Sequence, residues 1–130
     1  MIGKPTVLFV DNEATTRRMF DVQFTAFGIP HYIADSPENA VHILTENPVD
    51  IVVTDLIEPG DDGTDLIQCL RNSPETETLP IIFFAAEGDR DTVISAINAG
   101  ATTVMMKPMT SPDSLVERIY SLTKDALAAG

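Results

Sequence analysis

"VLFVDNEATT", residues 7–16, joins an apolar segment to a cluster of oxygen donors. The apolar part, Val7–Val10, does not alternate with polar residues, which is typical of a strand buried on both faces of a parallel sheet. Asp11, Asn12 and Glu13 follow it directly. A buried strand that ends on two acids and an amide predicts a polar site at one edge of the sheet.

Four further segments have the same strand-like character, so we expect strands at residues 6–10, 31–34, 51–54, 81–84 and 103–106. Apolar residues at helical spacing follow each strand: Phe20, Phe24 and Phe27; Ala40, Val41 and Leu44; Leu66, Ile67 and Leu70; Val93, Ile94 and Ile97; and Leu115, Ile119 and Leu122. This alternation predicts an α/β fold with a five-stranded parallel sheet and helices on both faces.

Glycine, proline and capping residues mark the ends of the expected helices. Gly28 and Gly100 each end a helix, as glycine often does in the position after the last turn. Ser36 and Pro37 begin the second helix, and Asn47-Pro48 ends it.

The length of 130 residues suits one domain, residues 1–130, with a core over about residues 6–123. Residues 124–130 are expected to be a helix tail or the start of a linker. No apolar run approaches the roughly 20 residues that a membrane span needs, and residues 1–5 do not resemble a signal peptide. The single cysteine, Cys69, fits a reducing cytoplasm and is interpreted as a packing or surface residue. We therefore expect a cytoplasmic protein that is not bound to a membrane.

The charge excludes one large class of partners. Twenty acids against eight bases give a net charge of −12. Nucleic-acid binding requires lysine and arginine to neutralise phosphates, and the only adjacent pair of bases is Arg17-Arg18, interpreted as a solvated helix face. We expect no direct binding to nucleic acid or to anionic membranes.

The residues that follow the strands should meet at one edge of the sheet, where open α/β sheets bind ligands. They are Asp11 and Asn12 after the first strand, Asp55 after the third, Ala85 after the fourth and Lys107 after the fifth. Two carboxylates within about 4 Å would repel by roughly 4 kcal/mol at an effective dielectric near 20, so a cation or a raised pKa must compensate.

This set of side chains has a chemical interpretation and a structural one. Hard oxygen ligands suit Mg²⁺, and a nearby lysine would neutralise an incoming phosphoryl group, so a carboxylate that accepts phosphate accounts for both. Alternatively, Asp11 and Asp55 only cap the loops that follow them. Two acids together with Lys107 favour the chemical interpretation.

The sequence resembles the response regulator receiver domain of two-component signalling. "VLFVDNE" (7–13) resembles its acidic turn, "DIVVTDLIEPGDDG" (50–63) its phosphoacceptor strand and loop, and "VMMKPM" (104–109) its Lys-Pro turn; "NAGATTVMMKP" (98–108) follows the family's approach to its last strand. The resemblance covers about residues 7–122. It implies a single (βα)5 flavodoxin-like domain with strand order 2-1-3-4-5, a signalling module rather than an enzyme.

The resemblance also implies roles for individual residues. Asp55 would be the phosphoacceptor, phosphorylated by a histidine kinase or a phosphotransfer protein with Mg²⁺. Asp11, Asp55, the backbone carbonyl of Ile57 and, more weakly, the neutral amide of Asn12 would bind the metal. Lys107 would contact the phosphoryl oxygens.

The resemblance extends to two further features. The Lys107-Pro108 peptide bond would be cis. Ile57 and Glu87 occupy the positions that modulate the lifetime of the phosphate in this family.

Three positions depart from the family pattern. Asn12 replaces a second acid, so Mg²⁺ binding should be weakened. Ala85 replaces a threonine or serine whose hydroxyl reaches the phosphate, and Val104 replaces a switch tyrosine or phenylalanine. The family's usual partner face, here around Ile94, Val104 and Tyr120, should therefore be reshaped or give way to another face; the same face could also form a homodimer.

Three functions follow from these observations. The first is a phosphorylatable receiver whose output is a protein–protein interaction with an unknown domain or protein. The second is a degenerate receiver that acts as an interaction module without phosphorylation. The third and most remote is a haloacid-dehalogenase-type phosphatase, because "DNEATT" (11–16) faintly resembles that family's D-x-D-x-T motif.

Overall fold

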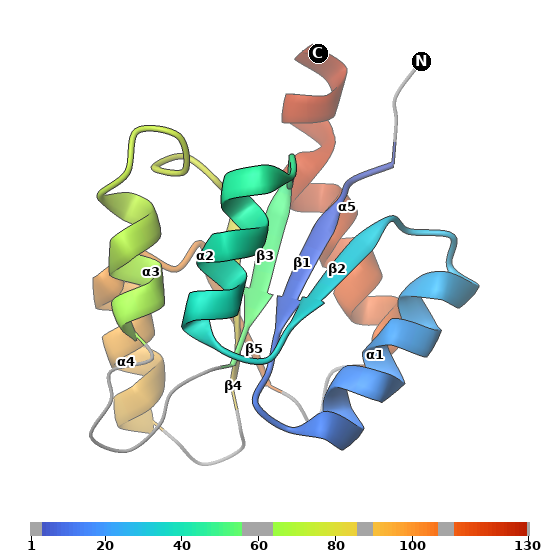
Figure 1. Ribbon diagram of the computed structural model, residues 1–130, viewed down its shortest axis with the longest axis horizontal. Helices are drawn as coiled ribbons and strands as arrows, with labels where there is room; N and C mark the ends of the chain where they lie inside the picture. Colours follow the sequence, from blue (N-terminus) through green and yellow to red (C-terminus); the bar gives the residue numbers. More distant parts are fainter. Residues whose placement is uncertain (1–3, 56–63, 86–89, 107–110, 130) are drawn as a thin grey trace.

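The computed structural model describes residues 4–55, 64–85, 90–106 and 111–129. Strands and helices alternate throughout: β1 (Val7–Val10), α1 (Ala14–Ala26), β2 (His31–Ala34), α2 (Pro37–Glu46), β3 (Ile51–Thr54), α3 (Thr64–Arg71), β4 (Ile81–Ala85), α4 (Arg90–Ala99), β5 (Thr103–Met106) and α5 (Pro112–Ala129). The five strands form one parallel sheet in the order β2-β1-β3-β4-β5 (Figure 1). The predicted fold class and strand order are confirmed.

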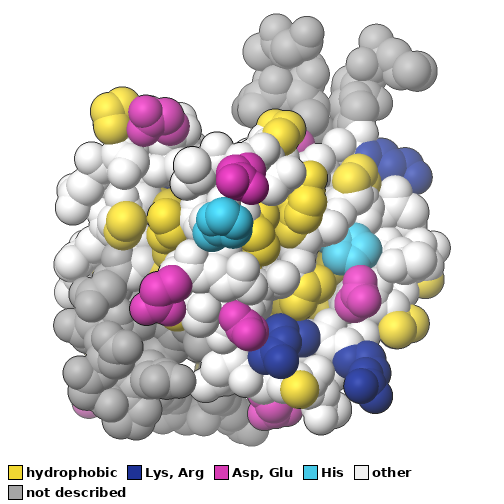
Figure 2. Space-filling view, in the orientation of Figure 1, with side chains coloured by type: hydrophobic (Ala, Val, Ile, Leu, Met, Phe, Trp, Pro, Cys, Tyr) yellow, Lys and Arg dark blue, Asp and Glu magenta, His cyan; other side chains and the backbone are white. Residues whose placement is uncertain are grey.

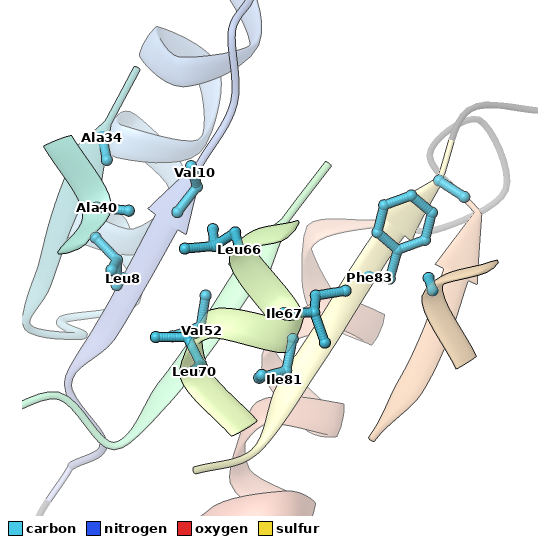
Figure 3. Packing of buried hydrophobic residues seen from close by; sticks show 12 residues of the cluster. Leu8, Val10, Ala34, Ala40, Val52, Leu66, Ile67, Leu70, Ile81 and Phe83 are labelled. Carbon is cyan, nitrogen blue, oxygen red and sulfur yellow. The ribbon is translucent and has the colours of Figure 1, made fainter. Parts of the chain in front are cut away.

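Helices cover both faces of the sheet, and each face has its own hydrophobic core (Figure 1). On one face α2, α3 and α4 pack on aliphatic residues of the strands and on Phe83 of β4. Leu66, Ile67 and Leu70 of α3, all buried, point toward the sheet beside Val52 and Ile81 (Figure 3). Burial of such side chains stabilises the fold by about 1.5–3 kcal/mol each.

The opposite face, under α1 and α5, is built around four phenylalanines. The ring of Phe9 on β1 stacks on Phe20 of α1 with centroids 4.8 Å apart, and its centroid lies 6.0 Å from that of Phe24 and 6.4 Å from that of Phe84. These offset and edge-on arrangements are the ones that aromatic rings prefer. The inner strands β1, β3 and β4 are therefore enclosed on both faces, as their lack of alternation predicts.

The helix ends follow the predicted signals. The Ser36 hydroxyl caps α2 by accepting a hydrogen bond from the Asn39 backbone N–H at 3.1 Å. Gly28 after α1 has a φ of +70° and Gly100 after α4 a φ of +118°, both in the region that glycine adopts most readily. Residues 124–129 belong to α5.

Some helix positions expected to face the core are exposed instead. Phe27 and Val41 are 38% exposed, and Ile94 and Ile97 of α4 are 48% exposed. In α4 the fully buried residue is Ala96, because the helix packs through a small side chain that lets it approach the sheet. A sequence pattern based on large apolar residues does not predict that a helix packs on the sheet through an alanine.

Arg71, at the end of α3, holds together two connections on the side of the sheet away from the carboxyl ends of the strands. Its Nε donates to the Gly100 carbonyl at 2.9 Å and its Nη1 to the Leu79 carbonyl at 2.7 Å. Nη1 also lies 3.2 Å from the Glu77 carbonyl and 3.3 Å from that of Thr76. Desolvation by burial lowers the pKa of Arg71 below its usual value. Sequence analysis did not identify this network.

None of the helices in the described ranges is both long enough and apolar enough to cross a membrane.

Candidate functional site

Two acids leave the sheet side by side at the carboxyl ends of its central strands. Val10 of β1 is in register with Thr54 of β3, so the next residues, Asp11 and Asp55, emerge at the same level. The Asp55 backbone N–H donates to the Val10 carbonyl at 3.1 Å, which extends the pairing beyond the strands. Neighbouring strands lie about 4.8 Å apart. The predicted proximity of these two acids is therefore present in the backbone.

Asp11 lies on the buried side of this site. It is fully buried, and its Oδ1 accepts a hydrogen bond from the Glu13 backbone N–H at 2.8 Å. The capping role considered for this acid is thus real, and it holds the turn between β1 and α1. A buried carboxylate needs such donors, since burial without compensation is costly.

Arg17 supports the same turn from the first part of α1. Its Nη1 donates to the backbone carbonyl of Asp11 at 3.0 Å, and the residue is half-buried. The interpretation of Arg17 as part of a solvated face is wrong, because its side chain reaches back across the turn. Arg18 beside it is exposed, as expected. A sequence pattern gives no signal for a bond from a helix to the carbonyl six residues earlier.

The other described residues of the site differ in how far their side chains are exposed to solvent. Asp55 is half-buried, and its Oδ1 atom is buried. Asn12 is exposed at the rim. Ala85, the last residue of β4, is 1% exposed and presents only a methyl group.

Four predicted site residues, Ile57, Glu87, Lys107 and Pro108, lie outside the described residues, and so does the predicted cis peptide bond. Lys107 directly follows Met106, whose register partner is Ala85. The strands that precede these positions therefore end at the same edge as β1 and β3.

The expected partner face is only partly exposed. Ile94 of α4 is 48% exposed and Tyr120 of α5 is 37% exposed. Val104 of β5 is half-buried and packs against the core under α2, α3 and α4. A valine here fills space beside Phe83, its register partner.

The donor set at the edge fits Mg²⁺. This ion takes oxygen ligands, is commonly held by one or two carboxylates, and keeps several waters. Asp11 and Asp55 supply the carboxylates and Asn12 an amide oxygen. Within the described ranges no group of three or more His, Cys, Asp or Glu side chains could hold a metal. The ring nitrogens of His31 lie 2.8 Å from the Ile29 carbonyl and 2.6 Å from Asp21 Oδ1.

Comparison with known proteins identifies the protein family that has this fold and this site. Residues 7–120 match the family model of the response regulator receiver domain, so the chain belongs to that family. It is 34% identical over 124 residues to the probable chemotaxis protein CheY of Rhizobium etli, with 93% of this chain and 96% of that protein covered. This membership leaves the phosphatase alternative without support.

A longer relative and a solved structure agree with this assignment. The phosphate regulon transcriptional regulatory protein PhoB of Pseudomonas aeruginosa is 32% identical over 124 residues; the match covers 95% of this chain, which spans about half of PhoB (53%). The crystal structure of a putative response regulator from Chloroflexus aurantiacus superposes with a TM-score of 0.84 at 32% identity and covers 94% of this chain and 99% of that one.

Proposed function

We propose that this chain is a phosphoryl-accepting receiver domain that is phosphorylated on Asp55. The observation that carries the proposal is the emergence of Asp11 and Asp55 at the same level of adjacent parallel strands. A half-buried carboxylate beside a fully buried one suits a site where a phosphoryl group and a cation meet. Receiver domains as a family use Mg²⁺ at the phosphorylation site.

In the proposed reaction a carboxylate oxygen of Asp55 attacks the phosphorus of a phosphohistidine on a histidine kinase or phosphotransfer protein. The new O–P bond forms an acyl phosphate, and the P–N bond breaks as the imidazole leaves and takes up a proton. Lys107 contacts the phosphoryl oxygens, and Ile57 and Glu87 influence the lifetime of the product. Asp11, Asp55, the Ile57 carbonyl and Asn12 would hold Mg²⁺, which supplies positive charge when bound.

The proposed output is a protein–protein interaction, with another protein or with a further domain. The net charge of −12 makes direct contact with nucleic acid unfavourable. We further propose that residues 1–130 form one receiver domain in the cytoplasm. A homodimer through the α4-β5-α5 face remains a secondary proposal.

One observation favours the degenerate receiver as a second candidate. Ala85 is buried at the end of β4 and has no hydroxyl to offer a phosphoryl group. If that contact is needed for stable phosphorylation, the chain would act through binding alone.

Intact-mass spectrometry after incubation with acetyl phosphate and Mg²⁺ separates the two candidates. We expect the wild-type chain to gain one phosphate and Asp55→Asn to gain none. Asp35→Asn is a matched control, because Asp35 follows the edge strand β2 as Asp55 follows β3, and it should behave like the wild type. No mass gain in the wild type at high acetyl phosphate would refute the proposal and support the degenerate receiver.

A further inference from the structure

A groove lies between α2 and α3, and none of the described residues that line it belongs to the Asp11–Asp55 site or to the α4-β5-α5 face. It consists of two adjoining cavities of about 370 and 430 Å³ that share Val41 of α2 and Cys69 of α3. Figure 2 shows hydrophobic side chains at the surface over these two helices. Val41 is 38% exposed and Cys69 is exposed, so the middle of the groove is apolar and open to solvent.

The groove is about two helical turns long. One cavity is lined by residues near the start of α2, including Pro37 and Glu38, and the other by residues near its end, including Leu44 and Thr45. At 1.5 Å per residue, Pro37 to Thr45 spans roughly 12 Å. That length matches the apolar stripe of a short helix with contacts at positions i, i+3 or i+4, and i+7.

An acidic residue lies at each end of this apolar groove. Glu38 lines one cavity and Glu75 lines the other, and no lysine or arginine is among the described residues that line them. On the face in Figure 2 some of the acidic side chains lie over α2 and α3, and the lysine and arginine side chains lie over other elements. The groove is thus complementary to a segment that is apolar in its middle and basic at both ends.

We propose that the α2–α3 groove binds a short amphipathic helix of a partner protein, with an apolar stripe of two turns flanked by lysine or arginine at each end. A second copy of this chain fits poorly, because two chains of net charge −12 repel each other. The same charge disfavours nucleic acids and anionic lipid. The site is separate from the proposed phosphorylation chemistry, so either proposal can fail without the other.

Cys69 provides a direct readout, because it is the only cysteine of the chain and lies in the groove. The probe is a stapled helical peptide of about 14 residues with leucines at i, i+4 and i+7 and two lysines at each end. At a concentration roughly ten times its Kd we expect the peptide to slow alkylation of Cys69 by iodoacetamide about tenfold, because about nine-tenths of the protein is then occupied.

Two pairs of variants locate the binding. Val41→Lys should abolish protection of Cys69, whereas Val22→Lys on α1, where Val22 is 60% exposed, should leave it unchanged. The double change Glu38→Gln with Glu75→Gln should raise the Kd about fourfold, the effect of losing two exposed ion pairs. Asp113→Asn with Glu117→Gln on α5 alters the net charge equally and should have little effect.

Several results would overturn the proposal. They are no protection of Cys69 by the peptide, equal protection by a peptide with glutamate in place of lysine, or equal effects of the paired variants. Protection of Cys69 that rises with protein concentration in the absence of peptide would instead assign the groove to self-association.

Discussion

At the scale of single residues, Asp11 and Asn12 are neighbours whose side chains differ in exposure. Asp11 is fully buried and bonded to the turn, whereas Asn12 is exposed at the rim of the site. A change at Asn12 can therefore alter the charge of the site without disturbing the turn. This makes Asn12 the position at which metal affinity can be tested separately from folding.

Asn12→Asp should raise the affinity for Mg²⁺ about tenfold, because the number of charged ligands sets the affinity of such sites. Titration calorimetry with MgCl₂ measures it. Asn98→Asp, at an exposed position of α4, adds the same charge elsewhere and should change the affinity little. Equal affinities for Asn12→Asp and the wild type would contradict the role given to Asn12.

Ala85 can be tested with a pair of side chains of equal shape. Ala85→Thr and Ala85→Val should each lower the free energy of unfolding by about 1–3 kcal/mol, because both enlarge a buried residue. Only the threonine supplies a hydroxyl, so only Ala85→Thr should raise the fraction phosphorylated by acetyl phosphate, by about threefold or more. Urea unfolding and intact-mass measurements report the two effects. An equal rise in Ala85→Val would show that volume, not the hydroxyl, matters.

At the scale of elements, Arg71 joins the end of α3 to two connections through backbone carbonyls. Gly100 permits this, because a Cβ at that position would lie 2.8 Å from Arg71 Cγ. The planar guanidinium carries five N–H donors on three nitrogens in a fixed geometry, whereas lysine carries three donors on a single nitrogen.

Arg71→Lys should therefore lower the free energy of unfolding by about 2 kcal/mol, the scale expected when several partly buried carbonyls lose their donors. Urea denaturation measures it. Arg118→Lys, at an exposed position of α5, is the matched control and should change it by less than about 0.5 kcal/mol. A loss of similar size in both variants would mean that the Arg71 bonds add little.

The elements differ in how well the sequence predicts them. The strands and the cap at Ser36 were predictable because continuous apolar runs and capping residues are local signals. The outward direction of Ile94 and Ile97 was not, since it depends on Ala96 contacting the sheet. Within the site, the shared edge of Asp11 and Asp55 followed from parallel strands.

Other contacts were beyond prediction from the sequence. The bond from Arg17 to Asp11 and the network of Arg71 depend on where long side chains meet distant backbone carbonyls. No local sequence pattern predicts these contacts.

At the scale of the whole molecule, the net charge of −12 works against compactness. The charges lie further apart in the unfolded chain, so screening should favour the folded state. Between roughly 20 and 200 mM NaCl we expect the free energy of unfolding to rise by about 1 kcal/mol.

Urea denaturation at each salt concentration measures this rise. Choline chloride should act like NaCl, because screening does not depend on the cation. MgCl₂ at equal ionic strength should stabilise the wild type further and Asp55→Asn less. A free energy of unfolding that falls as NaCl rises would contradict this account of the charge.

The strand order also has a consequence for synthesis on the ribosome. The first strand made, β1, lies inside the sheet and is covered on both sides only when β2 and β3 have emerged. From then on the sheet extends in one direction, with β4 added to β3 and β5 to β4. During synthesis each new strand is therefore added at one edge of the sheet, and this edge is exposed to other nascent chains and to chaperones. The opposite edge, β2, is already in place when β3 is made.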